Sequence, residues 1–335
     1  MHPNQQEINH DDKDEFRHRS HCLLFSFAFK KYGTNSGQNW VNEITASTPL
    51  TDFGNATYRG FQGGLYSNGS NYRPKAHNAA GLALAKGIKP LNSEGKRDEK
   101  SGTIVWLSIG MSNTTQETQA FLLRMQTFPA KNPKLTLVDG AVGGEDINRI
   151  NDSSASYWRA VYKRLSAVNL SPLQVQVIWF KEAEKRPTDT AFATYPDALK
   201  MKYKEVMQIL KAKFPNLKLV YLSSRIYAGY AKTKQNPEPF AWYTGWTVKR
   251  LIEDQIKGDA TLNYSGANPS AAWLSWGPYL WANGTTPRSD GLTWVPADYQ
   301  ADGTHPSVAG RQKVAEMLLH FFSNDDTAKP WFLKP

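Results

Sequence analysis

The stretch IVWLSIGMSNTTQE, residues 104–117, places a serine directly after a run of mostly apolar residues. The run is continuous rather than alternating, as expected for a strand that is covered on both faces of a sheet. The polar segment after it is typical of a helix, and Ser112, Asn113 and Thr114 are all of the types that cap a helix N-terminus. Thr114 and Glu117 also have the spacing of a capping box. Because Asn113 or Thr114 can cap the helix, we expect Ser112 to be free to face outward.

The same kind of apolar run recurs three times along the chain. LTLVDGA (135–141), VQVIWF (175–180) and LKLVYLSS (217–224) are separated by amphipathic stretches that predict helices. We therefore predict an α/β fold, a three-layer α/β/α sandwich with a mostly parallel, doubly wound sheet. The stretch PSVAGRQKVAEMLLHFF (306–322) predicts a closing helix with Pro306 at its first position.

The chain divides into three parts by composition. Residues 1–45 hold four of the seven histidines and many charges without periodicity, which predicts a disordered leader or tail. Within this part, Cys22–Phe29 has the length of an export-signal core but no cleavage site follows it, so a secreted or periplasmic protein and a cytoplasmic one both stay open. Residues 46–101 are rich in turn signals and contain one predicted helix at 75–88. We expect them to form a loop-rich extension packed on a main domain that spans 102–335.

The overall composition rules out disulfides and cysteine-based metal sites and argues against a nucleic-acid or membrane-spanning role. The single cysteine, Cys22, rules out an intrachain disulfide and a cysteine-based zinc site, and we expect neither a metal nor a cofactor. The net charge of +10 is spread among acidic residues rather than gathered in a block, which favours a solvated surface over nucleic-acid binding. No apolar run has the length of a membrane span. The sequence does not determine the oligomeric state.

A reactive serine needs a base, and the chain offers few histidines beyond its first 45 residues. His77 and His320 lie in predicted helices, where a core or surface role is the simpler interpretation. His305 instead stands in a loop before a helix, three residues after Asp302. In such an Asp-x-x-His turn the carboxylate accepts from one ring nitrogen and leaves the other free for the proton of a serine. The structural alternative is an Asp-Gly turn in which Thr304 caps the helix.

A pair of glycines, Gly143 and Gly144, follows the second predicted strand in GAVGGED. Such a pair allows backbone N–H groups to point into a crevice at the strand ends, where they can stabilise an oxyanion. An ordinary glycine turn is the alternative. Because ligands of open α/β sheets bind outside the carboxyl ends of the strands, the serine, the glycine pair and the Asp-His unit are expected at the same edge.

The segments SIGMSN, GAVGGED and DGTHPS resemble, in order and approximate spacing, the sequence blocks of the SGNH (GDSL-like) hydrolases, over roughly residues 102–322. The first is most similar to the form found in sialate O-acetylesterase-like carbohydrate esterases, and other segments are similar to a group of uncharacterised bacterial SGNH-like proteins. The resemblance implies a flavodoxin-like fold and a serine esterase. It implies Ser112 as nucleophile, His305 as general base and acid, and Asp302 as the group that orients His305.

The resemblance also implies an oxyanion hole formed by the backbone N–H groups of Ser112 and Gly144. The family's third donor is an Asn or Gln, but the matching strand end here reads VIWFKEAEK, so that position falls on Lys181 or Glu182. Lys181 could donate as an ammonium, or the two could pair with one another or with Arg186. This departure leaves two hypotheses. One is a serine esterase that removes acyl groups, in the first place acetyl, from a carbohydrate; the other is a glycan-binding protein on the same scaffold with hydrolysis reduced or lost.

A long aromatic segment between the fourth predicted strand and Asp302 is expected to form loops at the sheet edge, where long loops are commonly functional. Aromatic faces pack on sugars, and arginines can hold a carboxylate or a sulfate. The alternative is that the aromatic residues anchor these loops as core. An acylated carbohydrate is therefore predicted as substrate, and whether it is anionic stays open. The residues expected to contact it are Asn113, Gly143, Glu182, Arg225, Tyr227, Trp276, Trp281 and Arg288.

Overall fold

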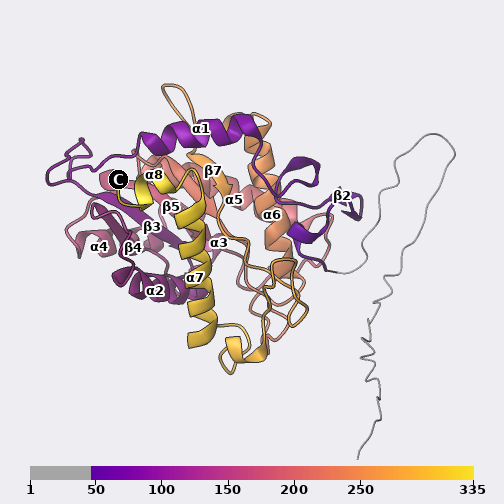
Figure 1. The fold of residues 1–335 in the computed structure, drawn as a ribbon. Helices are drawn as coiled ribbons and strands as arrows, with labels where there is room; N and C mark the ends of the chain where they lie inside the picture. Colours follow the sequence, from indigo (N-terminus) through magenta and orange to yellow (C-terminus); the bar gives the residue numbers. More distant parts are fainter. Residues whose placement is uncertain (1–46) are drawn as a thin grey trace, which may run out of the picture.

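A computed structural model describes residues 47–335 of the chain, and its main feature is a sheet of five parallel strands (Figure 1). The strands lie in the order β4-β3-β5-β6-β7. In chain order this is 2-1-3-4-5, the doubly wound order of flavodoxin-like folds. The predicted α/β fold with a parallel sheet is therefore confirmed. The strands are β3 (Ile104–Gly110), β4 (Leu135–Asp139), β5 (Val175–Lys181), β6 (Leu219–Leu222) and β7 (Trp273–Trp276).

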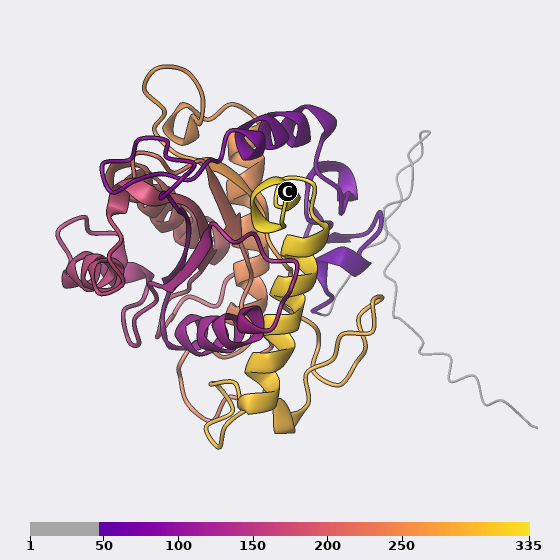
Figure 2. The same ribbon diagram turned by 60° about the vertical axis from the view of Figure 1, so that its left-hand side comes forward.

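Helices cover both faces of this sheet and complete the three layers (Figures 1 and 2). On one face α2 packs against α7, and α7 contacts α8. On the other face α5 packs against α6, and α3 contacts α4. The first group comprises α1 (Lys75–Lys86), α2 (Ser112–Gln126), α7 (Val308–Asn324) and α8 (Lys329–Phe332). The second comprises α3 (Ile147–Ile150), α4 (Ser156–Ser166), α5 (Tyr195–Lys213) and α6 (Phe240–Ile256).

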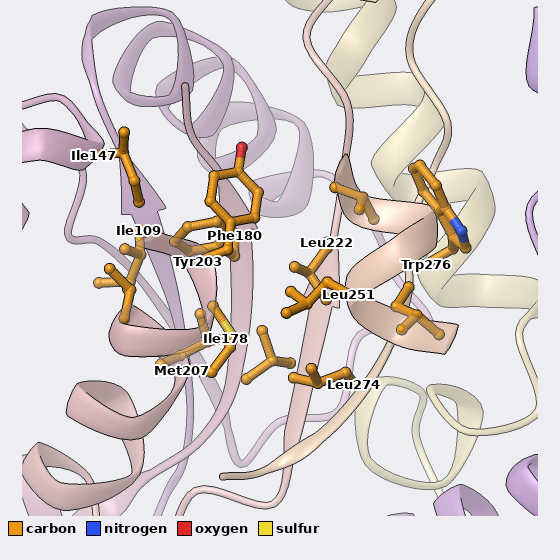
Figure 3. Packing of buried hydrophobic residues seen from close by; sticks show 14 of the residues in the cluster. Ile109, Ile147, Ile178, Phe180, Tyr203, Met207, Leu222, Leu251, Leu274 and Trp276 are labelled. Atoms are coloured by element: carbon orange, nitrogen blue, oxygen red, sulfur yellow. The ribbon is translucent and has the colours of Figure 1, made fainter. Parts of the chain in front are cut away.

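The continuous apolar runs are explained by these two layers. Successive side chains of a strand point to opposite faces, so a strand covered on both sides needs apolar residues throughout. In β3, Val105 and Leu107 belong to the core beneath α5 and α6, whereas Trp106 belongs to the core beneath α2 and α7. All three side chains are fully buried. Figure 3 shows the first of these cores, with Ile178 and Phe180 of β5 beside Tyr203 and Met207 of α5.

The aromatic segment after β6 differs from the prediction. It was expected to form long loops, but it contains the helix α6 and the fifth strand β7. Trp242 and Trp246 of α6 and Trp276 of β7 are almost completely buried. The glycines, prolines and asparagines that punctuate this segment indicate turns in the sequence, although α6 and β7 form within it.

The first part of the segment 47–101 packs against the β7 edge of the sheet, and its later residues contact the start of β5, where Gln176 hydrogen-bonds the Lys89 carbonyl at 2.8 Å. Its only two strands among the described residues, β1 (Thr57–Tyr58) and β2 (Phe61–Gln62), form a separate hairpin. The Tyr66 hydroxyl hydrogen-bonds Ser275 at 3.0 Å, and the Trp276 indole N–H donates to the Leu65 carbonyl at 2.7 Å. His77 of α1 hydrogen-bonds the Leu274 carbonyl at 2.8 Å. The chain division at residue 102 stays a prediction, and the expectations for residues 1–45 lie outside the described residues.

The closing helix begins two residues later than predicted. Ser307 is the N-cap of α7, and its hydroxyl accepts a hydrogen bond from the Gly310 N–H at 3.3 Å. Pro306 precedes the cap and forms an isolated bridge with Tyr299, so its predicted place at the first helical position is wrong. Among residues 47–335, none of the helices combines the length and apolarity that a bilayer crossing requires.

Candidate active site

Ser112, His305 and Asp302 form one chain of hydrogen bonds. Ser112 Oγ lies 2.9 Å from His305 Nε2, and His305 Nδ1 lies 2.6 Å from Asp302 Oδ2. When Nδ1–H donates to the carboxylate, Nε2 is left to accept from the serine hydroxyl. The structure thus brings together two turns that are 193 residues apart in the sequence. This arrangement is the one that proton transfer from a serine requires.

The turn that carries Asp302 holds its carboxylate firmly. Besides His305, the backbone N–H groups of Thr304 and His305 donate to Asp302 Oδ1 at 2.9 and 3.0 Å. Burial raises the pKa of Asp302, but these hydrogen bonds to the ionised form outweigh it and hold the pKa below its ordinary value. Gly303 has φ +66°, and a Cβ there would lie 1.8 Å from the Tyr230 carbonyl oxygen. The turn therefore requires glycine at that position.

Ser112 is the first residue of α2, and the residues after it do not cap the helix as expected. The N-cap is Met111, which makes no side-chain cap. Asn113 Nδ2 donates instead to the Thr304 carbonyl at 3.0 Å, and the Thr114 hydroxyl donates to the Lys181 carbonyl at 2.7 Å. The predicted capping is therefore wrong, because these side chains join the start of α2 to the His305 turn and to the end of β5.

The glycine pair lies beside Ser112. A Cβ built on Gly143 would lie 3.8 Å from the Ser112 Cβ. Gly144 has φ +82°, a left-handed conformation that favours glycine. Within residues 47–335, the amides of Ser112 and Gly144 have no hydrogen-bond acceptor. Both residues line the cavity described below.

Lys181 and Glu182 lie elsewhere than the resemblance implies. Lys181 Nζ contacts both carboxylate oxygens of Glu117 at 2.6 Å, and the Lys181 and Glu117 side chains are 1% and 0% exposed. Burial lowers the pKa of Lys181 to about 8, although Glu117 opposes that shift. Glu182 is buried, accepts from the Ala183 N–H at 2.8 Å, and has its pKa raised well above the ordinary value by burial. Lys181 pairs with Glu117 rather than with Glu182 or Arg186.

A cavity of about 240 Å³ opens at the serine. It is formed by segments that follow β3, β4, β5 and β6, at the carboxyl ends of the strands, together with the His305 turn. The chain reverses its direction of winding next to β3, so the cavity occupies the position where ligands bind in this fold. The lining residues are Met111, Ser112, Asn113, Gly143, Gly144, Lys185, Arg225, Gln235, Asn236, Thr304 and His305.

Only part of the predicted substrate-binding set reaches this cavity. Asn113, Gly143 and Arg225 line it. Glu182 and Tyr227 do not. Trp276, Trp281 and Arg288 are buried in the protein: Trp281 donates to Glu238 at 2.8 Å, and Arg288 forms an ion pair with Asp290. For the tryptophans, the core interpretation of the aromatic residues is the one that the structure supports.

Sequence reasoning missed four polar residues of the cavity, one of which, Thr304, was considered only as a helix cap. Lys185 follows β5 by four residues, and Gln235 and Asn236 come from the loop between β6 and α6. Lys185 could have been found from its place just beyond a strand end. Gln235 and Asn236 carry no motif, and only the path of their loop brings them to the site. In the described part of the chain, no cluster of His, Cys, Asp and Glu could hold a metal ion.

Comparisons with known proteins were made for both sequence and structure. No protein-family model matches the sequence, and no curated protein matches it. Among solved structures, the chain is similar to a carbohydrate esterase at 14% identity, over 68% of this chain and 70% of that one, with a TM-score of 0.37. A GDSL-like lipase from Bacteroides thetaiotaomicron is 12% identical, over 73% and 96%, with a TM-score of 0.35. An extracellular lipase from Streptomyces rimosus is 10% identical, over 65% and 100%, with a TM-score of 0.34. At such low values these similarities carry no argument about the chemistry of this chain.

Proposed function

We propose that this protein is a serine esterase of the SGNH type that removes short acyl groups, in the first place acetyl, from a carbohydrate. The observation that carries the proposal is the hydrogen-bonded chain from Ser112 Oγ through the His305 ring to Asp302. It lies beside two amides without acceptors in the described structure and at the carboxyl edge of a doubly wound sheet. Serine nucleophiles with an oriented histidine and an oxyanion hole perform acyl transfer on several unrelated folds.

The reaction follows from this geometry. His305 Nε2 takes the proton of Ser112, whose oxygen attacks the ester carbonyl, and the developing oxyanion is stabilised by the amides of Ser112 and Gly144. Collapse of the tetrahedral intermediate breaks the ester bond as His305 returns the proton to the leaving alcohol. Water, deprotonated by His305, then attacks the acyl-serine; as the bond to Ser112 breaks, His305 returns the proton to the serine oxygen and the acid is released. Asp302 stabilises the imidazolium in both steps.

The size and lining of the cavity support a short acyl group and a polar alcohol. Its volume of about 240 Å³ is at the small end for a ligand site, and Met111 is the one apolar side chain among its lining residues. A long acyl chain would need an apolar groove. The amides of Asn113, Gln235 and Asn236 and the cations of Arg225 and Lys185 suit hydroxyl-rich ligands instead.

The experiment is the hydrolysis of 4-nitrophenyl acetate and of acetylated polysaccharides, the latter followed by released acetate. We expect turnover by the parent and a loss of at least about a thousandfold in kcat for Ser112→Ala, because the nucleophile is removed. Ser166→Ala is the matched control: the Ser166 hydroxyl, at the end of α4, donates to the Lys163 carbonyl at 3.0 Å, and the residue does not line the cavity. It should retain parental activity.

Two outcomes would contradict the proposal. Activity that survives Ser112→Ala would remove this serine from the mechanism. No activity in the parent, combined with retention of glycans on an affinity gel, would favour the glycan-binding alternative. The absence of Lys181 from the cavity is the observation that keeps this alternative in view, since it leaves two backbone donors without the third that the resemblance implies.

A further inference from the structure

Arg225 is a buried cation in the wall of the cavity. It follows β6, is 4% exposed, and lines the same cavity as Ser112 and His305. Its guanidinium makes one long hydrogen bond, from Nη1 to Asn236 Oδ1 at 3.4 Å. Nε and Nη2 have no acceptor among the described residues. A buried guanidinium with so few partners is costly for the fold, which points to a functional reason for keeping it.

The carboxyl groups nearest to Arg225 are engaged elsewhere. Glu117, Glu182 and Glu238 all act on its charge, but none forms an ion pair with it within residues 47–335. Glu117 is paired with Lys181. Glu238 accepts from two backbone N–H groups and from the Trp281 indole, at 2.8 to 3.0 Å. Burial raises the pKa of Glu182 well above its ordinary value, which favours the neutral form of that carboxyl group.

A second cation stands at the mouth of the cavity. Lys185 Nζ lies close to Gly144, because a Cβ built on that glycine would be 3.9 Å away. No carboxylate in the described chain forms an ion pair with Lys185, which also lines the cavity. Lys185 and Gly144 also line an adjoining groove of about 310 Å³. Arg149 and Arg186 stand in that groove, and Arg149 lies 4.0 Å from the Glu145 carboxylate. The one carboxylate that lines the groove, Asp146, is buried and accepts from the Lys185 backbone N–H at 2.8 Å. Cations at the mouth and in the wall make the approach to Ser112 electropositive.

We propose that the substrate is an acidic carbohydrate ester, and that Arg225 binds an anionic group carried by the same sugar chain as the scissile ester. This inference deepens the proposed esterase function and rests on it. A carboxylate or a sulfate supplies the oxygen acceptors that the guanidinium lacks within the protein. Lys185, together with Arg149 and Arg186, attracts the rest of the anionic chain along the groove. Arg225 is thus the residue that determines specificity for charge, and Ser112 performs the reaction.

The test uses sugars as competitive inhibitors of 4-nitrophenyl acetate hydrolysis by the full chain. Galacturonate carries a carboxylate at carbon 6, galactose 6-sulfate carries a sulfate there, and galactose is their neutral counterpart. For the parent we expect one or both anionic sugars to have an inhibition constant at least about tenfold below that of galactose, as a charged hydrogen bond provides. In Arg225→Gln this ratio should fall towards one, and in Arg225→Lys part of it should remain.

Arg288→Gln is the matched control, because Arg288 is buried to a similar degree but is bound to Asp290 and lies outside the cavity. It should keep the parental ratio. Equal inhibition by all three sugars in the parent would overturn the inference even if Arg225→Gln fails to fold, and so would a preference that survives in Arg225→Gln. If the parent hydrolyses no ester, the proposed function fails. Calorimetric titration of the three sugars then decides the anion site on its own.

Discussion

Asp302 is the residue whose role the geometry defines most narrowly. Its carboxylate receives the His305 ring and two backbone N–H groups, so it fixes both the tautomer and the orientation of the imidazole. Its pKa is held below the ordinary value, which keeps the group ionised at neutral pH. An amide in the same place would keep the shape but could offer its NH₂ group to Nδ1, and so favour the wrong tautomer.

We therefore predict that Asp302→Asn lowers kcat by about 10²–10⁴ with a small change in KM. Steady-state kinetics with 4-nitrophenyl acetate measures both parameters. Asp298→Asn is a control for loss of a buried carboxylate nearby, since Asp298 pairs with Lys313 and does not line the cavity. A parental kcat in Asp302→Asn would show that the Asp302 carboxylate does not serve the reaction.

Two elements, α2 and β5, are joined behind Ser112 by the buried ion pair of Lys181 with Glu117. Lys181 ends β5, where it is paired in register with Gly110 of β3, and its carbonyl accepts from Thr114 in the first turn of α2. The pair therefore holds the start of the helix that carries Ser112 against the end of the sheet. This role as a link between elements replaces the predicted role as an oxyanion donor.

Removing one partner of the pair leaves the other charge buried and unpaired. We predict that Glu117→Leu or Lys181→Met alone lowers the free energy of unfolding by about 3 kcal/mol. The double variant should be less destabilised than either single variant, because no buried charge is left. Urea unfolding of the four proteins measures the coupling. Additive losses in the double variant would contradict the account of the pair as a mutually dependent link.

The contact between α1 and β7 depends on a neutral histidine. His77 stacks on Trp273 with ring centroids 4.8 Å apart and hydrogen-bonds the Leu274 carbonyl. Burial lowers its pKa below 6.5; the hydrogen bond to Leu274 opposes this shift and Arg73 adds to it. The unfolded chain therefore takes up a proton at a higher pH than the folded chain, so this group's contribution to stability falls as the pH drops below 6.5.

We predict that the stability advantage of the parent over His77→Gln shrinks between pH 7.5 and pH 5, because glutamine can keep a hydrogen bond to Leu274 but does not titrate. The measurement is urea unfolding of both proteins at several pH values. A constant difference between the parent and His77→Gln would contradict a depressed pKa at His77.

At the scale of the whole molecule, the sequence predicts the part of the fold that has clear periodicity. The strands β3, β4, β5 and β6 are short apolar runs between amphipathic stretches, and the helices after them have polar outer faces. The helix α6 and the strand β7 were missed because the aromatic segment that holds them is punctuated by glycine, proline and asparagine, which indicate turns and loops.

The residues of the candidate site could also be predicted from the sequence only in part. Ser112, Asp302 and His305 could be proposed because His305 is the one histidine of residues 47–335 outside a helix, Asp302 stands three residues before it, and Ser112 comes two residues after the end of a strand. Gln235 and Asn236 could not, since no motif marks them and their loop reaches the cavity only in the folded chain, where Asn236 Nδ2 donates to the Glu184 carbonyl. The prediction that tryptophans contact the substrate was wrong because the sequence does not distinguish an aromatic side chain that lines a groove from one that fills a core. Trp276 and Trp281 fill the core.

The account depends on the convergence of the Ser112 and His305 turns across the molecule, and covalent labelling of the serine tests this most directly. Diisopropyl fluorophosphate transfers its phosphoryl group to an activated serine oxygen with loss of fluoride, while the base takes the serine proton. Mass spectrometry of the digested protein should find one adduct, on Ser112, and the adduct should be lost in His305→Gln. No adduct on Ser112, or labelling that proceeds equally well without His305, would contradict the central claim.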